Sequence, residues 1–170
     1  MNLILLIITR TPIWVWALLA ALVALGLHQA RDHEVSRGRA LVQPIALGLL
    51  SFFGAASAFG WHATVQPVWL AGFALGIALS RHLMPPLRVQ ALAGGRFAIG
   101  GSWAPLVLIV AIFMLRYVGS VSLAIVPQLA DLPLFAAGAS ALYGLPSGLL
   151  AARARRLLQA GRPALALQAA

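Results

Sequence analysis

The sequence predicts an all-α fold, a polytopic membrane bundle of five transmembrane helices. Its composition predicts burial in lipid: apolar residues make up 62% of the 170 residues and charged residues only 9%. The mean hydropathy is +0.95. A soluble domain carries roughly 25% charged residues, so this chain could not cover a surface that faces water. We therefore exclude a soluble globule and a disordered chain.

Five stretches approach the about 20 apolar residues that a transmembrane helix needs. They are residues 12–27, 41–60, 67–83, 104–125 and 132–151. Proline stands near the start of each stretch, where its missing N–H costs nothing, and polar neighbours such as Thr11 can cap the first turn. Residues 1–151 are thus expected to form one transmembrane domain, followed by a basic cytoplasmic tail over 152–170.

The first stretch is interpreted as an uncleaved span and not as a signal peptide. Its nearest cation, Arg10, follows the leading apolar run where a signal peptide carries its charge before it. The stretch 27–30 also lacks small residues at both positions of a cleavage site.

Between the third and fourth stretches, the sequence predicts a small cytoplasmic hairpin. Pro85-Pro86 ends the third helix. Residues 87–92 and 96–99 then flank Ala93-Gly94-Gly95, which is typical of a glycine turn. Apolar residues alternate along both arms, so one face could lie on the bilayer or on the ends of the helices.

The arginines predict the orientation, because cytoplasmic connections of membrane proteins are enriched in them. Ten fall on one side of the predicted bundle: Arg31, Arg37, Arg39, Arg81, Arg88, Arg96, Arg153, Arg155, Arg156 and Arg162. Only Arg10 falls on the other side, which puts the N-terminus outside and the C-terminus in the cytoplasm. An aromatic belt agrees, with Trp14, Trp16, Trp61 and Trp69 near the outer interface and Trp103 near the inner one. We expect a multi-pass protein of the bacterial inner (plasma) membrane.

These arginines mark helix ends and do not form the aromatic-interleaved patch of a nucleic-acid binder, so we expect no nucleic-acid partner. Arg153, Arg155 and Arg156 are expected to contact anionic lipid head groups, at about 1 kcal/mol per basic residue near the surface. The bilayer is the expected partner, and a homo-oligomer or a membrane partner protein stays open.

Arg116 is the one charged residue inside a predicted span. It stands about 18 Å from the inner edge, where a cation is costly and is by default a candidate functional residue. Tyr143 of the fifth span reaches a similar depth, so a hydrogen bond or a cation–π contact between them is expected. Tyr117 and Ser147 would complete a polar seam, a row of polar side chains between the fourth and fifth spans. The pair of Arg116 and Tyr143 is expected either to hold the helices together, as a polar lock, or to form a site for an anion.

The sequence lacks the residues that several kinds of chemistry require. No Asp or Glu lies within a predicted span, which excludes a carboxylate proton relay. The chain has no Cys, which excludes disulfides and thiol chemistry. His28 and His82 end two spans on the same side and could bracket a haem or metal, but nothing in their spacing requires it. We expect no cofactor, no metal and no enzymatic activity.

Several short motifs carry a resemblance that covers nearly the whole chain. They are Thr11-Pro12-Ile13-Trp14-Val15-Trp16, Gly100-Gly101-Ser102-Trp103, Arg116-Tyr117, Tyr143-Gly144 with Ser147-Gly148, and Arg153-Ala154-Arg155. On these motifs the chain resembles a family of uncharacterised five-span inner-membrane proteins of proteobacteria, known as a domain of unknown function. The resemblance implies a shared cation before the Tyr of the fourth span. The chain is more distantly similar to a cytochrome c biogenesis membrane protein, although this chain has no Cys that could perform thiol chemistry.

Together these observations predict an integral inner-membrane protein of unknown activity, which serves as a non-enzymatic interaction or accessory protein. The alternative is a small anion or solute transporter, or a channel subunit, that uses Arg116 to attract its substrate. Small-residue stripes, Gly72-x-x-x-Gly76 and Ser140-x-x-x-Gly144-x-x-x-Gly148, are expected to let helices approach closely within the chain.

Overall fold

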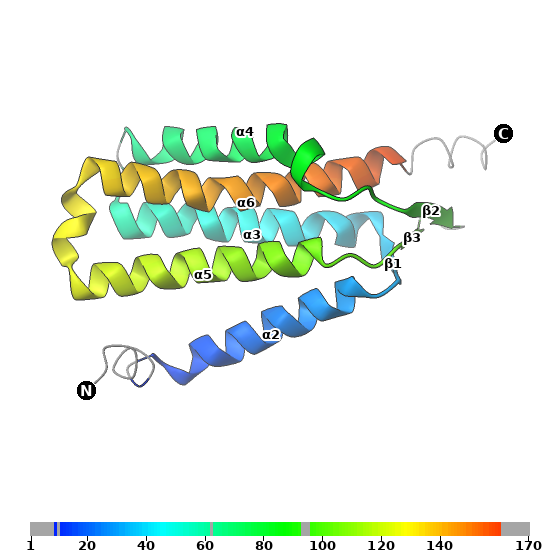
Figure 1. Cartoon of the computed structure of the whole chain (residues 1–170), viewed down its shortest axis with the longest axis horizontal. Helices are drawn as coiled ribbons and strands as arrows, with labels where there is room; N and C mark the ends of the chain where they lie inside the picture. Colours follow the sequence, from blue (N-terminus) through cyan, green and yellow to red (C-terminus); the bar gives the residue numbers. More distant parts are fainter. Residues whose placement is uncertain (1–8, 10, 62, 93–95, 161–170) are drawn as a thin grey trace.

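The computed structural model describes residues 9, 11–61, 63–92 and 96–160, which form a helical bundle with a small sheet at one end (Figure 1). The long helices are α2 (Ile13–Ala30), α3 (Arg37–Phe59), α4 (Val65–Leu83), α5 (Ala104–Ile125) and α6 (Pro133–Ala160). A short 3-10 helix, η2 (Pro127–Asp131), joins α5 to α6 at the end opposite the sheet. Consecutive helices run in opposite directions.

Four of these helices are long and apolar enough to cross a membrane. The qualifying segments are Ile13–Ala30, Ala40–Phe59, Ala104–Ile125 and Pro133–Gln159. The remaining helix, α4, has 19 residues, but Gln66 at its start and Arg81 and His82 at its end lower its hydropathy. The predicted helical bundle is thus confirmed, with four of its five long helices suited to cross a membrane, and the five spans stay a prediction.

Helices α3 and α6 extend furthest beyond the predicted spans. Helix α3 begins at Arg37, so Pro44 lies inside it and not in its first turn as expected. Pro44 lacks the N–H that would bond the carbonyl of Ala40, so that this early turn of α3 has one fewer hydrogen bond. Helix α6 continues to Ala160, so the first nine residues of the predicted tail are helical. Residues 161–170, with Arg162, lie outside the described residues.

A three-stranded antiparallel sheet closes one end of the bundle. Its strands are β1 (His33–Ser36), β2 (Val89–Leu92) and β3 (Arg96–Ile99), in the order β1-β3-β2. The predicted hairpin corresponds to β2 and β3, and its turn at 93–95 lies outside the described residues. Strand β1, from the connection between α2 and α3, was not predicted.

The apolar face of this sheet lies on the helices, which decides between the two predicted positions. Phe97 is 1% exposed and Ile99 is 6% exposed, and both pack with Leu157 near the end of α6. Marginal strands of four residues need such support. The extension of α6 beyond the predicted span therefore supplies part of the core of the sheet.

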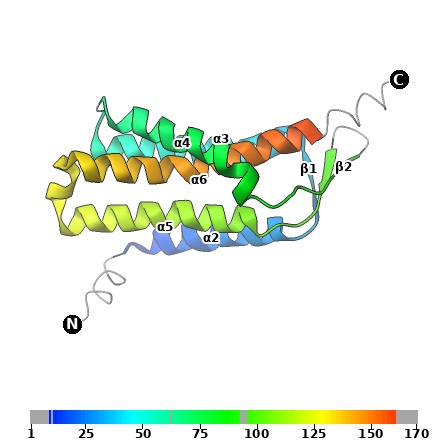
Figure 2. The same cartoon turned by 45° about the horizontal axis from the view of Figure 1, so that its top comes forward.

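The closest contact between helices joins α4 and α6, which lie side by side in both views (Figures 1 and 2). A Cβ on Gly72 or Gly76 would overlap a backbone carbonyl of α6, and one on Gly144 or Gly148 would overlap a backbone carbonyl of α4. The two predicted small-residue stripes thus face each other within one chain. Helix α2 lies on the far side of the bundle and packs against α5.

The outer surface of the bundle is apolar. Leu50, Leu70, Val118 and Leu142 point outward, each more than half exposed, as expected of side chains that face lipid. The tryptophans predicted to line the membrane interfaces follow this pattern with one exception. Trp14, Trp61 and Trp103 are more than 60% exposed and Trp16 is 40% exposed, but Trp69 is only 6% exposed and lies in the core. Its place in the aromatic belt was predicted wrongly, because hydropathy gives depth but not the direction in which a side chain points.

Gly148→Leu is expected to destabilise the bundle, because the new side chain would meet the carbonyl oxygen of Phe73 and force α4 away from α6. Overpacking of this kind costs about 1–3 kcal/mol. Thermal unfolding in mild detergent, followed by circular dichroism, would measure it. Gly138→Leu is the matched control: Gly138 lies on the same helix with nothing within 4 Å of its Cβ position, so its melting temperature should not change. Equal melting temperatures for the two variants would contradict the packing described.

Candidate functional site

Arg116 lies within α5, between α3 and α6. Its Cζ atom is 5.4 Å from the centre of the Tyr143 ring on α6, over the ring face. On the other side, a Cβ added to Gly54 of α3 would overlap the guanidinium group. The structure thus brings Arg116 and Tyr143 together in the predicted cation–π contact, and Gly54 makes room for it.

No carboxylate balances this cation within the described part of the chain. The ion pair found there joins Arg96 to Glu34 at the sheet, and Arg116 makes no hydrogen bond to another described residue. A cation over an aromatic ring gains about 2 kcal/mol when it is shielded from water. The Tyr143 hydroxyl in turn lies against Gly119, one turn further along α5, where a Cβ would overlap it. Each member of the pair therefore faces a glycine.

The backbone of α6 at Tyr143 is the centre of a second polar cluster. Ser51 of α3 donates a hydrogen bond to the Tyr143 carbonyl at 2.8 Å, and Ser147 donates to the same oxygen at 3.2 Å. Trp69 of α4 donates from Nε1 to Ser51 Oγ at 3.2 Å. Pro146 lies in the same turn of α6, but the carbonyl that it leaves without a helical donor is that of Leu142, four residues earlier, and not that of Tyr143. Three helices are linked at one carbonyl.

Ser51 and Trp69 were not among the predicted site residues. In the sequence, Ser51 is a serine within an apolar span, and this alone does not indicate which group its hydroxyl bonds. Ser147, which was predicted, does lie at the site, though it bonds the backbone of its own helix and not Arg116.

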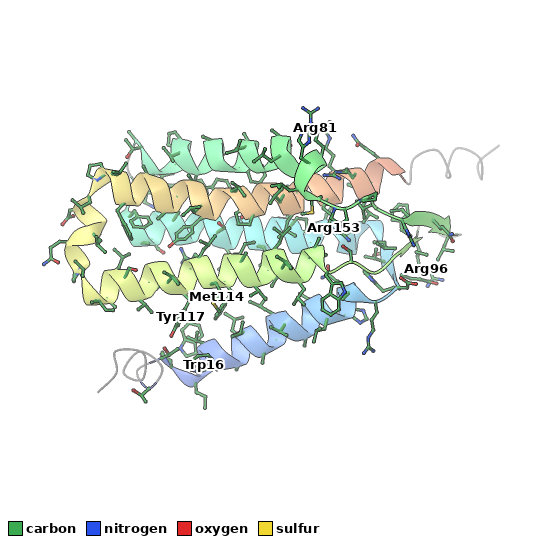
Figure 3. All side chains as sticks on the ribbon, viewed as in Figure 1. Trp16, Arg81, Arg96, Met114, Tyr117 and Arg153 are labelled. Carbon is green, nitrogen blue, oxygen red and sulfur yellow. The ribbon has the colours of Figure 1, made fainter. Side chains whose placement is uncertain are left out.

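Tyr117 lies away from Arg116 and faces α2. Its hydroxyl is hydrogen-bonded to Thr11 Oγ1 at 2.8 Å, and its ring is 6.4 Å from that of Trp16 (Figure 3). Neighbouring residues on an α-helix point about 100° apart, so Arg116 and Tyr117 cannot face the same seam. Tyr117 instead fixes the start of α2 to α5, and Thr11 serves this contact where it was expected to cap a helix.

His28 and His82, which were considered as a possible pair around a haem or metal, each have another neighbour. His28 lies beside His33, with ring centres 5.6 Å apart, and His82 accepts a hydrogen bond from Arg81. Helices α2 and α4 lie on opposite sides of the bundle (Figures 1 and 2). Among the described residues, no three His, Cys, Asp or Glu side chains gather where they could hold a metal ion.

The sheet end of the bundle is basic and tied together by polar contacts. Asp32 Oδ1 accepts a hydrogen bond from the Gly101 N–H at 2.7 Å, and the Ser102 N–H donates to the Gln29 carbonyl at 3.2 Å. Glu34 of β1 pairs with Arg96 of β3 at 3.2 Å. These contacts fix the connection after α2 to the connection before α5.

Two adjoining cavities lie at this end of the bundle. One has a volume of about 570 Å³ and is walled by polar and apolar residues in equal number, and the other has about 420 Å³ and is walled largely by apolar ones. Arg153 of α6 lies in the wall of both. Of the other predicted lipid contacts, Arg155 is exposed, and Arg156 has a buried Nη2 atom with no partner in the described part of the chain.

Residues 1–167 match the family of unknown function DUF6622, and the chain belongs to this family. The predicted membership of an uncharacterised family is thereby confirmed. No curated protein and no solved structure matches the chain, and no similarity to cytochrome c biogenesis proteins is found.

The contact between Arg116 and Tyr143 is expected to stabilise the bundle by about 0.5–2 kcal/mol. A double-mutant cycle of Arg116→Leu and Tyr143→Leu, read as unfolding free energy in mild detergent, isolates this coupling from the cost of each truncation. Tyr143→Phe keeps the ring and is the control that should retain the coupling. Additive effects of the two leucine substitutions would contradict the contact.

Proposed function

We propose that this member of the DUF6622 family is an integral protein of the bacterial inner membrane with five spans, and that it serves as a non-enzymatic interaction or accessory protein. The positions of its arginines support the orientation. All described arginines except Arg116 lie at the sheet end of the bundle, where Figure 3 labels Arg81, Arg96 and Arg153. Because arginine is enriched on the cytoplasmic side, the sheet end would face the cytoplasm and the start of α2 the outside.

The connections of the chain support a fifth span. Helix α3 ends at the end opposite the sheet, and α5 begins at the sheet end. The chain between them is α4, which lies in backbone contact with α6. If α3 and α5 both cross the bilayer, α4 has to traverse the same thickness to connect them.

The observation that carries the accessory role is the sheet itself. It is fixed to the bundle, and its surroundings expose Arg31, Arg88 and Arg96 as a basic surface of guanidinium donors. Such a surface suits an acidic partner, because arginine binds carboxylates and phosphates bidentately. Arg116 lies in the wall of neither cavity described above, so nothing in the geometry favours the transporter alternative.

Single-cysteine labelling tests the five-span topology, and the Cys-free chain is well suited to it. In spheroplasts, a membrane-impermeant maleimide should label Ala63→Cys and Gln128→Cys, which precede α4 and lie in η2. Gln90→Cys in β2 should react only after the membrane is opened. Labelling of Ala63→Cys and Gln90→Cys from the same side would exclude a crossing by α4.

Site-specific photo-crosslinking tests the interaction role. A crosslinker at Gln90 should capture a defined protein in native membranes, and this product should fall severalfold in an Arg88→Gln/Arg96→Gln variant, because charge-assisted hydrogen bonds are lost. The same crosslinker at Gln128, at the opposite end of the bundle, is the control. No product from Gln90, together with an anion flux into liposomes that Arg116→Leu abolishes, would replace this proposal with the transporter.

A further inference from the structure

The two cavities at the sheet end share several wall residues; the larger has a wall of mixed polarity and the smaller a largely apolar one. The larger one is walled by Arg88, Gln90 and Ser102 among others. The smaller is walled largely by apolar side chains of four helices, among them Leu25, Leu47 and Leu150. Arg153 is one of the residues that line both cavities, so a guanidinium group lies where the two adjoin. This is the arrangement that a molecule with a charged head and a hydrocarbon chain requires.

The charges that line the larger cavity favour an anion. Of its two acids, Glu34 is balanced by Arg96, and Asp32 accepts the Gly101 N–H but keeps its charge, so two cations face one unbalanced carboxylate. Its two cations, Arg88 and Arg153, make no ion pair with any described residue. The cavity therefore offers two uncommitted guanidinium groups, which bind phosphate oxygens well.

A separate observation in the smaller cavity points to a polar atom of a ligand. Gln43 lies in its wall, and its Oε1 accepts a hydrogen bond from Gln29 at 2.7 Å. Its Nε2 is buried with no hydrogen-bond partner among the described residues. A buried amide donor is costly to leave unpaired, and an ester carbonyl would satisfy it.

We propose that these cavities bind one anionic phospholipid of the inner leaflet. Its phosphate lies on Arg153 and Arg88, an ester carbonyl accepts from Gln43 Nε2, and an acyl chain fills the crevice between α2 and α3. The site rests on the proposed membrane orientation, which brings the sheet end to the depth of the inner head groups. A free phosphate would leave the apolar crevice empty, so the phospholipid is the occupant that uses both cavities.

Native mass spectrometry of the delipidated protein tests the site. The probes are phosphatidylglycerol and phosphatidylcholine with the same chains, added in mild detergent. We expect a one-to-one adduct with phosphatidylglycerol that is at least about fivefold weaker in Arg153→Gln. Arg155→Gln is the matched control, because Arg155 is exposed on the same helix and lies in the wall of neither cavity.

Two further variants keep the test decisive if Arg153→Gln does not fold. Arg88→Gln removes the second guanidinium from an exposed position just before β2. Ala46→Phe places a ring in the crevice from an exposed position of α3, where the core is not disturbed. Both should weaken the adduct with phosphatidylglycerol, and the folded state of each is checked by its melting temperature.

Equal loss of the adduct in Arg153→Gln and Arg155→Gln would overturn the site, since surface charge alone would then explain binding. Equal binding of phosphatidylcholine, or full binding by Ala46→Phe, would overturn it as well. These outcomes are distinct from failure of the proposed function: cysteine labelling can still find five spans in a protein with no selective lipid adduct.

Discussion

The direct contact between the backbones of α4 and α6 is the constraint on which the rest of the bundle depends. Glycines on both helices remove the side chains that would separate them. This brings Trp69 of α4 within reach of Ser51, and Ser51 within reach of the Tyr143 carbonyl. Helix α6 can then contact α3, α4 and α5 at once. The polar groups at mid-depth have partners because this one contact is close.

The bundle pairs the polar groups that an apolar environment makes costly, and it does so in two ways. At the Tyr143 carbonyl of α6, the hydroxyls of two serines supply hydrogen-bond donors. At Arg116, an aromatic face takes the place of a carboxylate. Both solutions meet at Tyr143, whose ring contacts the cation and whose carbonyl accepts the hydroxyls. Contacts from α3 and α5 therefore converge on this one residue of α6, although only the contact with Arg116 requires its ring.

The helices could be predicted from the sequence because hydropathy and proline positions act locally. The pairing of Arg116 with Tyr143 followed from depth alone. What could not be predicted depends on rotation about a helix axis and on distant partners. Tyr117 was assigned to the wrong seam, and Trp69 to the membrane interface, because depth does not say which way a side chain points. Strand β1 was missed, since its four residues form a strand only when β3, about 60 residues later, pairs with them.

The order of the strands has a consequence for how the protein is made. The central strand, β3, pairs with β1, which is synthesised first, and its apolar face is covered by Leu157 near the end of the last helix. The sheet therefore reaches its final form only after nearly the whole chain has left the ribosome and α6 has taken its place. A chain truncated before the end of α6 would lack Leu157 and with it part of the apolar cover of β3.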